Sequence, residues 1–371
     1  MRIAVLNLTG GGLSGGYRKY LRCLLPRLGA HPGVADLLIV VPPGQEDLSC
    51  GVPVEPWPAG DQWRGFAALR ARVRAWRPDV VFIPTSRWIG AGAPTVVMVR
   101  NMEPLARPFG GGSVATGLRN LVHASVARRS VLRATRVIAV SEFVRQHLVD
   151  RWCLPEDRVS VVYHGVDPAD AMAGGTSAQA EEPFLFAAGS LLPYRGLEDA
   201  VDALALLVEP PVDRLTLVIA GDGSAAYRAA IARRAAERGV SARVRWVGHL
   251  DAQGMARGFT EALAFLMTSR VEACPNTALE AMAHGSPCIS TLAPPMPEFF
   301  GDAALFYGPG DAATLAAHVR RLATDAAMRR ALGASGQERA LGFTWDETVR
   351  RTVAELRRAL GRNANGSHPE G

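Results

Sequence analysis

Short apolar runs rich in Val, Ile and Leu alternate along this chain with longer segments in which apolar residues recur every three or four positions. The first pattern is typical of buried strands and the second of amphipathic helices. In the first half of the chain, the alternation predicts strands at 3–8, 35–41, 80–84, 96–99, 137–140 and 159–163, and helices at 17–28, 66–76, 114–132 and 142–149.

A second series of the same kind follows a stretch without periodicity. Residues 168–182 are rich in Ala, Gly, Ser and Thr, which is the composition of a linker. Beyond this linker the pattern predicts strands at 184–188, 215–220, 244–247, 263–267 and 288–290, helices at 197–207, 225–238, 252–260 and 277–284, and three closing helices at 312–322, 327–341 and 345–360.

Strands that alternate with helices indicate the α/β class, with parallel sheets covered by helices on both faces. We therefore predict two doubly wound, Rossmann-like domains, at 1–167 and 183–344, that face each other across a cleft. Residues 361–371 continue none of these patterns, and we expect them to form a disordered tail.

Composition excludes several classes of protein. A chain of 371 residues with 48% hydrophobic and 20% charged residues is typical of a globular protein with room for two domains. Its apolar runs are far shorter than the roughly 20 residues of a membrane span, and it begins with a strand, so we expect no transmembrane anchor or signal peptide. The five cysteines form no Cys-x-x-Cys pair, which favours a reducing cytoplasm over a disulfide framework or a zinc site.

Charge is unevenly divided along the chain. Residues 1–165 carry 21 basic and 11 acidic side chains, and they include Arg128, Arg129 and Arg133 on one predicted helix. Two interpretations stay open: a solvated face, or a surface that attracts an anionic acceptor or the lipid headgroups at the inner face of the membrane. Nucleic acid is not an expected partner, because no aromatic pattern or motif supports it.

Two glutamates carry the most chemical information. Glu272 and Glu280 lie in the run that follows the strand predicted at 263–267, and Gly285 closes the helix predicted at 277–284. Glu272 is thus expected in a strand-to-helix loop and Glu280 one turn inside the helix. Ligands of open α/β sheets bind at such loops. The alternative is a pair of solvated carboxylates without a function.

The residues around this pair favour the functional interpretation. The chain reads Glu-x-Cys-Pro-Asn from Glu272 and Leu-Glu-Ala-Met-Ala-x-Gly-x-Pro from Leu279. This run resembles the signature of retaining glycosyltransferases of the GT-B fold, family 4. The resemblance implies that Glu272 reaches the hydroxyls of a donor sugar and that Glu280 binds the ribose of a nucleotide. It also implies that the final helix, 345–360, packs back on the first domain.

The same resemblance implies further donor contacts. Main-chain amides at Asn276 and Thr277 would hold phosphate and sugar, and Cys274 lies where common relatives have Gly-Phe-Gly. In the turn from Gly189 to Gly196, Ser190 stands where relatives have arginine and Arg195 where they have lysine. Arg195 would stabilise the departing diphosphate; a plain surface arginine is the alternative. Residues near the end of the strand at 244–247 would read the base: Gly248, His249 and Leu250.

The first domain is expected to contribute the acceptor side. Gly15 and Gly16 match a family Gly-Gly, although Gly10, Gly12 and Gly15 also fit a dinucleotide-binding fingerprint and a purely structural turn. The fingerprint is disfavoured because Asp36 begins, and does not end, the second strand. Beyond the strand at 96–99, the acceptor-pocket candidates are Asn101, Met102 and Glu103.

The predicted activity is transfer of a sugar from a nucleotide sugar to a hydroxyl of a saccharide, a lipid-linked acceptor or a small molecule. The chain has no Asp-x-Asp pair, so we expect no metal, and the resemblance implies no cofactor and a front-face mechanism that retains configuration. Two alternatives stay open: a sugar-nucleotide epimerase of the same fold, and a non-catalytic binding subunit.

Overall fold

A computed structural model describes residues 1–8, 15–45, 52–57, 62–110, 114–167 and 183–364. The chain forms two compact units, which are described separately. Unit 1 comprises Met1–Pro108, Ala115–His164 and Trp345–Gly371, and unit 2 comprises Phe109–Val114 and Gly165–Thr344. The linker predicted at 168–182 lies outside the described residues. In the described part of the chain, no helix combines the length and apolar composition needed to cross a membrane.

Unit 1 is built on a parallel sheet with the strand order β3-β2-β1-β4-β5-β6-β7. Its strands are β1 (Arg2–Leu6), β2 (Asp36–Val41), β3 (Val54–Pro56), β4 (Val80–Ile83), β5 (Thr95–Val99), β6 (Arg136–Ala139) and β7 (Val159–Val161). The sequence pattern missed β3. This strand is short and contains a proline, which a sheet tolerates at an edge because proline has no N–H to donate.

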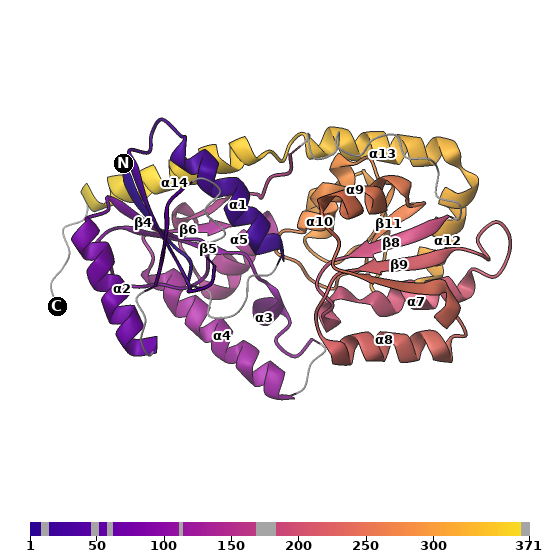
Figure 1. Cartoon of the computed structure of the whole chain (residues 1–371). Coiled ribbons are helices and arrows are strands. Elements are labelled where there is room, and N and C mark those ends of the chain that lie inside the picture. Colours follow the sequence, from indigo (N-terminus) through magenta and orange to yellow (C-terminus); the bar gives the residue numbers. More distant parts are fainter. Residues whose placement is uncertain (9–14, 46–51, 58–61, 111–113, 168–182, 365–371) are drawn as a thin grey trace. The chain divides into compact units, whose positions relative to one another are not determined.

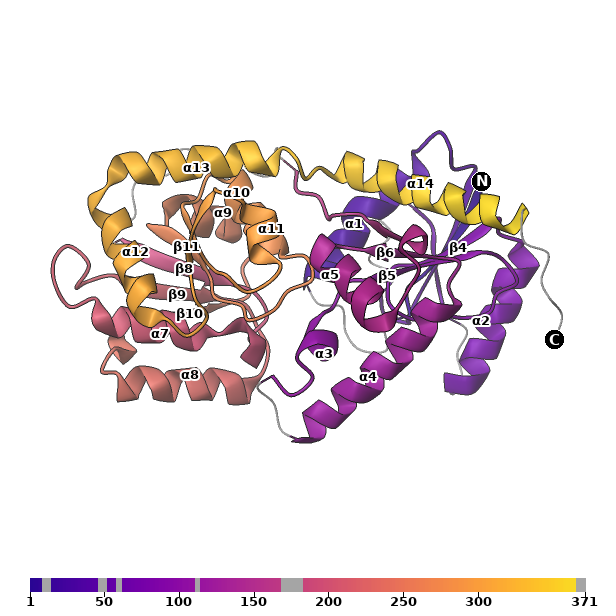
Figure 2. The same cartoon turned by 180° about the vertical axis from the view of Figure 1, so that it is seen from behind.

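The helices of unit 1 lie on both faces of this sheet. They are α1 (Gly15–Gly29), α2 (Gln62–Trp76), α3 (Glu103–Ala106), α4 (Val114–Arg133), α5 (Glu142–Gln146) and α14 (Trp345–Ala364). In both views α14 lies on one side of the sheet, and α2 and α4 lie on the other (Figures 1 and 2). The helix predicted at 142–149 is α5 followed by a π-helical turn, His147–Arg151.

Helix α14 packs within unit 1 through aromatic and charged contacts. Trp345 is buried beside Tyr20 and His164. One turn before the end of the predicted helix, Glu355 accepts a 2.6 Å hydrogen bond from Nε of Arg136, and both side chains are buried. The tail was predicted to begin at 361, but α14 continues to Ala364 because Gly361 keeps a right-handed backbone, and one glycine costs a helix only about 1 kcal/mol. Residues 365–371 lie outside the described residues.

Unit 2 is built on a second parallel sheet with the order β10-β9-β8-β11-β12-β13. Its strands are β8 (Phe184–Ala188), β9 (Thr216–Ala220), β10 (Val244–Gly248), β11 (Ala264–Met267), β12 (Cys288–Thr291) and β13 (Ala304–Tyr307). Its helices are α7 (Leu197–Leu206), α8 (Ala225–Glu237), α9 (Ala252–Glu261), α10 (Asn276–Ala283), α11 (Met296–Phe300), α12 (Ala312–Thr324) and α13 (Ala326–Ala340). The pattern missed β13 and α11, which are four and five residues long.

Successive side chains of β8 point to opposite faces of the unit 2 sheet, and each face has its own apolar core. Leu185 and Ala187 belong to the apolar cluster shared with α7, α8 and α12. Phe186 points to the other face, where it packs against Phe259 and Phe265. The views agree that α7 and α8 lie on one side of this sheet and α9, α10 and α13 on the other (Figures 1 and 2). The sheet is therefore buried on both faces, as a parallel sheet requires.

Both sheets have the doubly wound strand order, so the predicted fold class is confirmed. The order reverses between β1 and β4 in unit 1, and between β8 and β11 in unit 2. Ligands of such sheets bind outside the carboxyl ends of the strands at these reversal points. The cleft predicted between the two domains stays a prediction.

Candidate functional site

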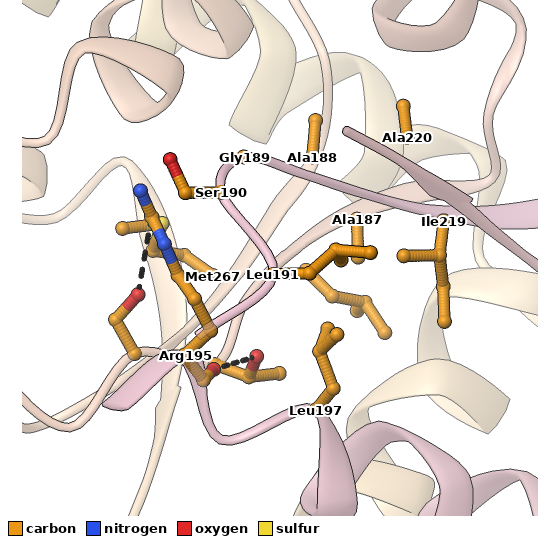
Figure 3. Close-up of a pocket in the computed structure, with 13 residues that line it drawn as sticks. Ala187, Ala188, Gly189, Ser190, Leu191, Arg195, Leu197, Ile219, Ala220 and Met267 are labelled. Atoms are coloured by element: carbon orange, nitrogen blue, oxygen red, sulfur yellow. Dashed lines mark hydrogen bonds between the residues drawn. The ribbon is translucent and has the colours of Figure 1, made fainter. Parts of the chain in front are cut away.

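A pocket lies at the reversal point of the second sheet, where β8, β9 and β11 end. Counting the space that is open to solvent, it has about 290 Å³ of empty volume. Its walls come from the ends of these strands and from the loop after β8: Ala187, Ala188, Gly189, Ser190, Leu191, Arg195, Leu197, Ile219, Ala220, Leu266, Met267, Thr268 and Ser269. Arg195 is the one charged side chain among these lining residues. In Figure 3 it lies on the same side of the loop as Ser190, whereas Leu191, Leu197 and Ile219 gather on the other side.

Glycines shape the loops around this pocket. Gly189 has φ +140° and Gly196 has φ +61°, and both values are rare for residues with a side chain. A Cβ atom on Gly196 would lie 2.5 Å from the carbonyl oxygen of Thr268. On Gly221, at φ +124°, it would lie 1.9 Å from the carbonyl oxygen of Gly189. The loops after β8, β9 and β11 therefore approach one another more closely than side chains would permit.

Three side chains form a hydrogen-bonded cluster at the pocket. Nη1 of Arg195 donates to Oε1 of Glu272 over 2.6 Å and to Oγ of Ser269 over 3.4 Å. The Ser269 hydroxyl donates to the same Glu272 oxygen over 2.9 Å. The side chains of Arg195 and Glu272 are only 16% and 12% exposed, so their charges interact with little screening by water.

Arg195 remains a cation and keeps donor capacity. Burial is the largest single influence and lowers the pKa of Arg195, but the Glu272 carboxylate together with Tyr194 and Tyr227 outweighs it, and the net pKa lies above its ordinary value. Its Nε–H is buried without a hydrogen-bond partner among the described residues. A guanidinium fixed by one nitrogen, with another N–H unused, is suited to bind an oxyanion.

Hydrogen bonds fix the loop that carries Glu272 to the loop that carries Arg195. The Thr268 hydroxyl donates to the carbonyl of Arg195 over 2.6 Å, and the amide of Arg270 donates to the carbonyl of Tyr194 over 2.7 Å. The Arg270 side chain donates to buried Asp199 over 2.6 Å, and Asp199 also accepts from Tyr307 and from the amide of Gly310. Burial and the Asp199 charge raise the pKa of Tyr307, which keeps its hydroxyl as a donor.

The start of α10 is the second polar feature after β11. Pro275 precedes the helix and makes no side-chain capping hydrogen bond. Such an end attracts anions through its N–H groups and its dipole. Cys274 and Glu280 are half-buried. The sequence predicted that Glu280 lies one turn inside this helix, and in the structure it lies one turn inside α10.

The remaining donor candidates follow the neighbouring strand. Gly248 ends β10 with φ +67°, and its carbonyl accepts a 2.7 Å hydrogen bond from the amide of Gly221. His249 is exposed and Leu250 is half-buried. All three residues lie at the carboxyl edge that the pocket occupies, but none of them lines the pocket described above.

The acceptor-side candidates belong to unit 1. Gly15 and Gly16 begin α1 and are exposed. Asn101 is exposed and accepts a 3.1 Å hydrogen bond from the amide of Glu103, which begins α3. Met102 is buried, with 1% of its surface exposed, so it packs in the core. Gly10 and Gly12 lie outside the described residues, and Asp36 is the first residue of β2.

Sequence reasoning missed three polar features. Ser269 joins Arg195 to Glu272, and its only sequence signal is its position two residues after a buried strand. The pair formed by Arg270 and Asp199 joins residues 71 apart, so no local pattern reveals it. In unit 1, Arg100 follows β5 and stacks 3.4 Å from the ring centre of Tyr17.

Two units of this strand order, with a charged pocket at a carboxyl edge, share the architecture of nucleotide-binding α/β proteins. Two family models match the chain: "Glycosyl transferases group 1" over residues 172–339 and "Glycosyltransferase Family 4" over residues 31–170. The chain belongs to this glycosyltransferase family, whose enzymes have the GT-B fold.

Individual relatives agree with this membership. D-inositol 3-phosphate glycosyltransferase of Frankia alni is 28% identical to this chain. The aligned part covers 61% of this chain and 60% of that relative's length. Glycogen synthase of Mycobacterium tuberculosis is 28% identical over 82% of this chain and 76% of its own. The fold resembles Anabaena HepE in complex with UDP-glucose, with a TM-score of 0.77, 19% identity, and coverage of 96% of this chain and 100% of the other.

Proposed function

We propose that this protein is a retaining glycosyltransferase that moves a sugar from a nucleoside diphosphate to a hydroxyl acceptor without a metal ion. The observation that carries the proposal is the cluster of Arg195, Glu272 and Ser269 at the pocket. It places a cation and a carboxylate side by side at the edge of the sheet where nucleotides bind in this architecture. The solved complex of HepE contains a nucleotide sugar, which supports a donor of the same class.

Arg195 supplies the cation for the departing diphosphate. Its buried Nε–H has no hydrogen-bond partner among the described residues and can bond a phosphate oxygen after a small shift of the side chain, while Nη1 stays bound to Glu272. The amides at the start of α10 supply further positive potential. Ser190, which lines the pocket beside Arg195, can donate one hydrogen bond but carries no charge. Arg195 therefore takes most of the charge that develops on the leaving group.

The two glutamates bind the neutral parts of the donor. Glu280 accepts from the ribose hydroxyls, because a carboxylate offers several acceptor lone pairs and no donor. Glu272 accepts from hydroxyls of the donor sugar with the lone pairs that Arg195 and Ser269 leave unused. Backbone groups at Gly248, His249 and Leu250 contact the base, and Cys274 shapes the sugar pocket.

The reaction proceeds by front-face attack. The acceptor oxygen forms a bond to the anomeric carbon on the face from which the diphosphate departs, and the acceptor proton passes to a departing phosphate oxygen. No separate base or cofactor takes part. The enzyme contributes position and charge stabilisation. Four residues of unit 1 form the acceptor side: Gly15, Gly16, Asn101 and Glu103. The reaction takes place in the cytoplasm or at the inner face of the membrane.

Product analysis tests this proposal. We expect one nucleotide sugar of a panel to raise the unfolding temperature, since a ligand of the native state stabilises it. With an acceptor, that donor should give a product of retained anomeric configuration, at a rate that EDTA does not change. Glu280→Gln should raise the donor KM, whereas Glu237→Gln, an exposed glutamate of α8, should not. Inverted product, loss of activity in EDTA, or donor conversion without any acceptor would overturn it.

A further inference from the structure

Helix α4 buries its small and polar residues and exposes its large apolar ones. The residues that face the body of unit 1 are Gly117, Asn120, Ala127, Ser130 and Val131. Only one of them is a large apolar residue. A helix at the surface of a globular protein normally shows the opposite arrangement, with its apolar stripe toward the core. Packing inside unit 1 therefore does not explain the apolar residues of this helix.

Five apolar residues form a continuous stripe on the outward side, here called the outer α4 face. They are Val114, Leu118, Leu121, Val122 and Val126, and their exposed fractions range from 42% to 73%. The spacing of four, three, one and four residues keeps them on one side of the helix over more than three turns. Both views show α4 on the side of the unit 1 sheet opposite α14 (Figures 1 and 2).

The charged residues of α4 itself have a single sign; the Glu103 carboxylate contacts the helix at Asn120, on its buried face. No aspartate or glutamate occurs between Glu103 and Glu142, a stretch that includes all of α4. Arg119 lies within the span of the stripe, and Arg128 and Arg129 follow Val126, its last residue; all three arginines are exposed. An apolar stripe bordered by arginines is the composition of a helix that lies in a membrane interface.

We propose that the outer α4 face docks unit 1 on a membrane that contains anionic lipids. The 20 residues of α4 give it a length of about 30 Å, so it can lie flat along the surface. Its apolar side chains enter the boundary between headgroups and acyl chains, and its arginines bind lipid phosphates. A second copy of this chain is a poorer occupant, because its own α4 offers no carboxylate to these arginines. The inference does not depend on the proposed function.

Vesicle co-sedimentation tests this docking. We expect the protein to bind vesicles of phosphatidylcholine mixed with phosphatidylglycerol, to bind pure phosphatidylcholine weakly, and to dissociate as salt is raised. Leu118→Ser with Val122→Ser should weaken binding about 10-fold or more, and Arg128→Gln with Arg129→Gln should do the same. Leu292→Ser with Leu341→Ser is the matched control, because these leucines are equally exposed on unit 2. The control should bind normally.

Three results would overturn the proposal. They are absence of binding to the anionic vesicles, α4 variants that bind like the unchanged protein, and a dimer in solution that Leu118→Ser with Val122→Ser dissociates. The same variants should transfer sugar to a water-soluble acceptor at the normal rate. Vesicle binding is measured without substrate, so its outcome is independent of whether the proposed transfer reaction is correct.

Discussion

The two units share one strand order but place their buried ion pairs at opposite edges of their sheets. In unit 2, Arg195 pairs with Glu272 beyond the carboxyl ends of the strands, beside the pocket. In unit 1, Arg136 is the first residue of β6, so its pair with Glu355 lies at the amino end of the strand. At the carboxyl edge of unit 1, Arg100 stacks on Tyr17 and forms no ion pair with a described residue.

This difference separates function from stability. Ligands bind at the carboxyl edge of a doubly wound sheet, so a pair placed there can exchange partners with a substrate. An ion pair at the amino edge lies away from this binding site, and the pair of Arg136 and Glu355 joins β6 to α14. We therefore expect substitutions of the first pair to change turnover more than stability, and substitutions of the second to do the reverse.

The largest effect on catalysis is expected at the carboxyl edge of unit 2. Arg195→Ala removes the cation nearest the departing diphosphate, and kcat should fall about 10²- to 10³-fold. Arg195→Lys should recover part of this loss, since it keeps the charge and loses the forked geometry. Steady-state kinetics measure both, with Arg238→Ala, an exposed arginine of unit 2, as the control. Near-normal turnover of Arg195→Ala would remove this residue from the mechanism.

At the amino edge of unit 1, Glu355→Gln leaves a buried guanidinium without its carboxylate. The free energy of unfolding should fall by about 3–5 kcal/mol, while kcat of the folded fraction stays unchanged. Urea unfolding followed by tryptophan fluorescence measures this, because six of the seven tryptophans belong to unit 1. A stability loss below about 1 kcal/mol would contradict the structural role of the pair.

The next largest loss of stability is expected where the backbone at Gly221 lies close to the carbonyl of Gly189, at the carboxyl edge of unit 2. Gly221→Ala would place a Cβ atom against the carbonyl of Gly189 at positive φ, and we expect a loss of about 2–4 kcal/mol from strain and overpacking. Gly239→Ala is the matched control: it has φ +72° but open space around the Cβ position, and should lose about 1–2 kcal/mol. Thermal unfolding followed by circular dichroism compares the two. Equal losses would show that the close approach of the loops is unimportant.

The smallest effect on stability is expected for Glu347, a partly exposed carboxylate of α14 that pairs with Arg350 and Arg351. Hydrogen bonds from Arg350 and Arg351 lower the pKa of Glu347 from 4.5 to about 2, despite opposing desolvation. The folded-state pKa is depressed, so the stabilisation is present above pH 4.5 and is lost as pH falls toward 2. Glu347→Gln should cost at most about 1 kcal/mol at pH 7, because the group is partly exposed. Urea unfolding measures the difference in the free energy of unfolding between the unchanged protein and Glu347→Gln. This difference should be smaller at pH 3 than at pH 7.

Much of the fold follows from local patterns. Strands buried on both faces are continuous apolar runs, and this signal located 11 of the 13 strands, with bounds that differ by at most two residues. The exceptions, β3 and β13, are short edge strands. The end of α14 was misplaced because a single glycine does not stop a helix that is already held by packing. Helix α4 was located correctly, but its apolar residues face outward, which a helical period alone cannot reveal.

By itself, the sequence determined the class of the fold, the order of its elements and the loop positions of Glu272 and Arg195, because each depends on neighbours in the chain. Only the tertiary structure decided that these two side chains, 77 residues apart, meet through Ser269, that Asp199 holds Arg270, and that α4 turns its apolar stripe outward. The physical reason is that a side chain's partners are set by how strands and helices pack. The periodicity of one segment carries no information about which distant segment will lie beside it.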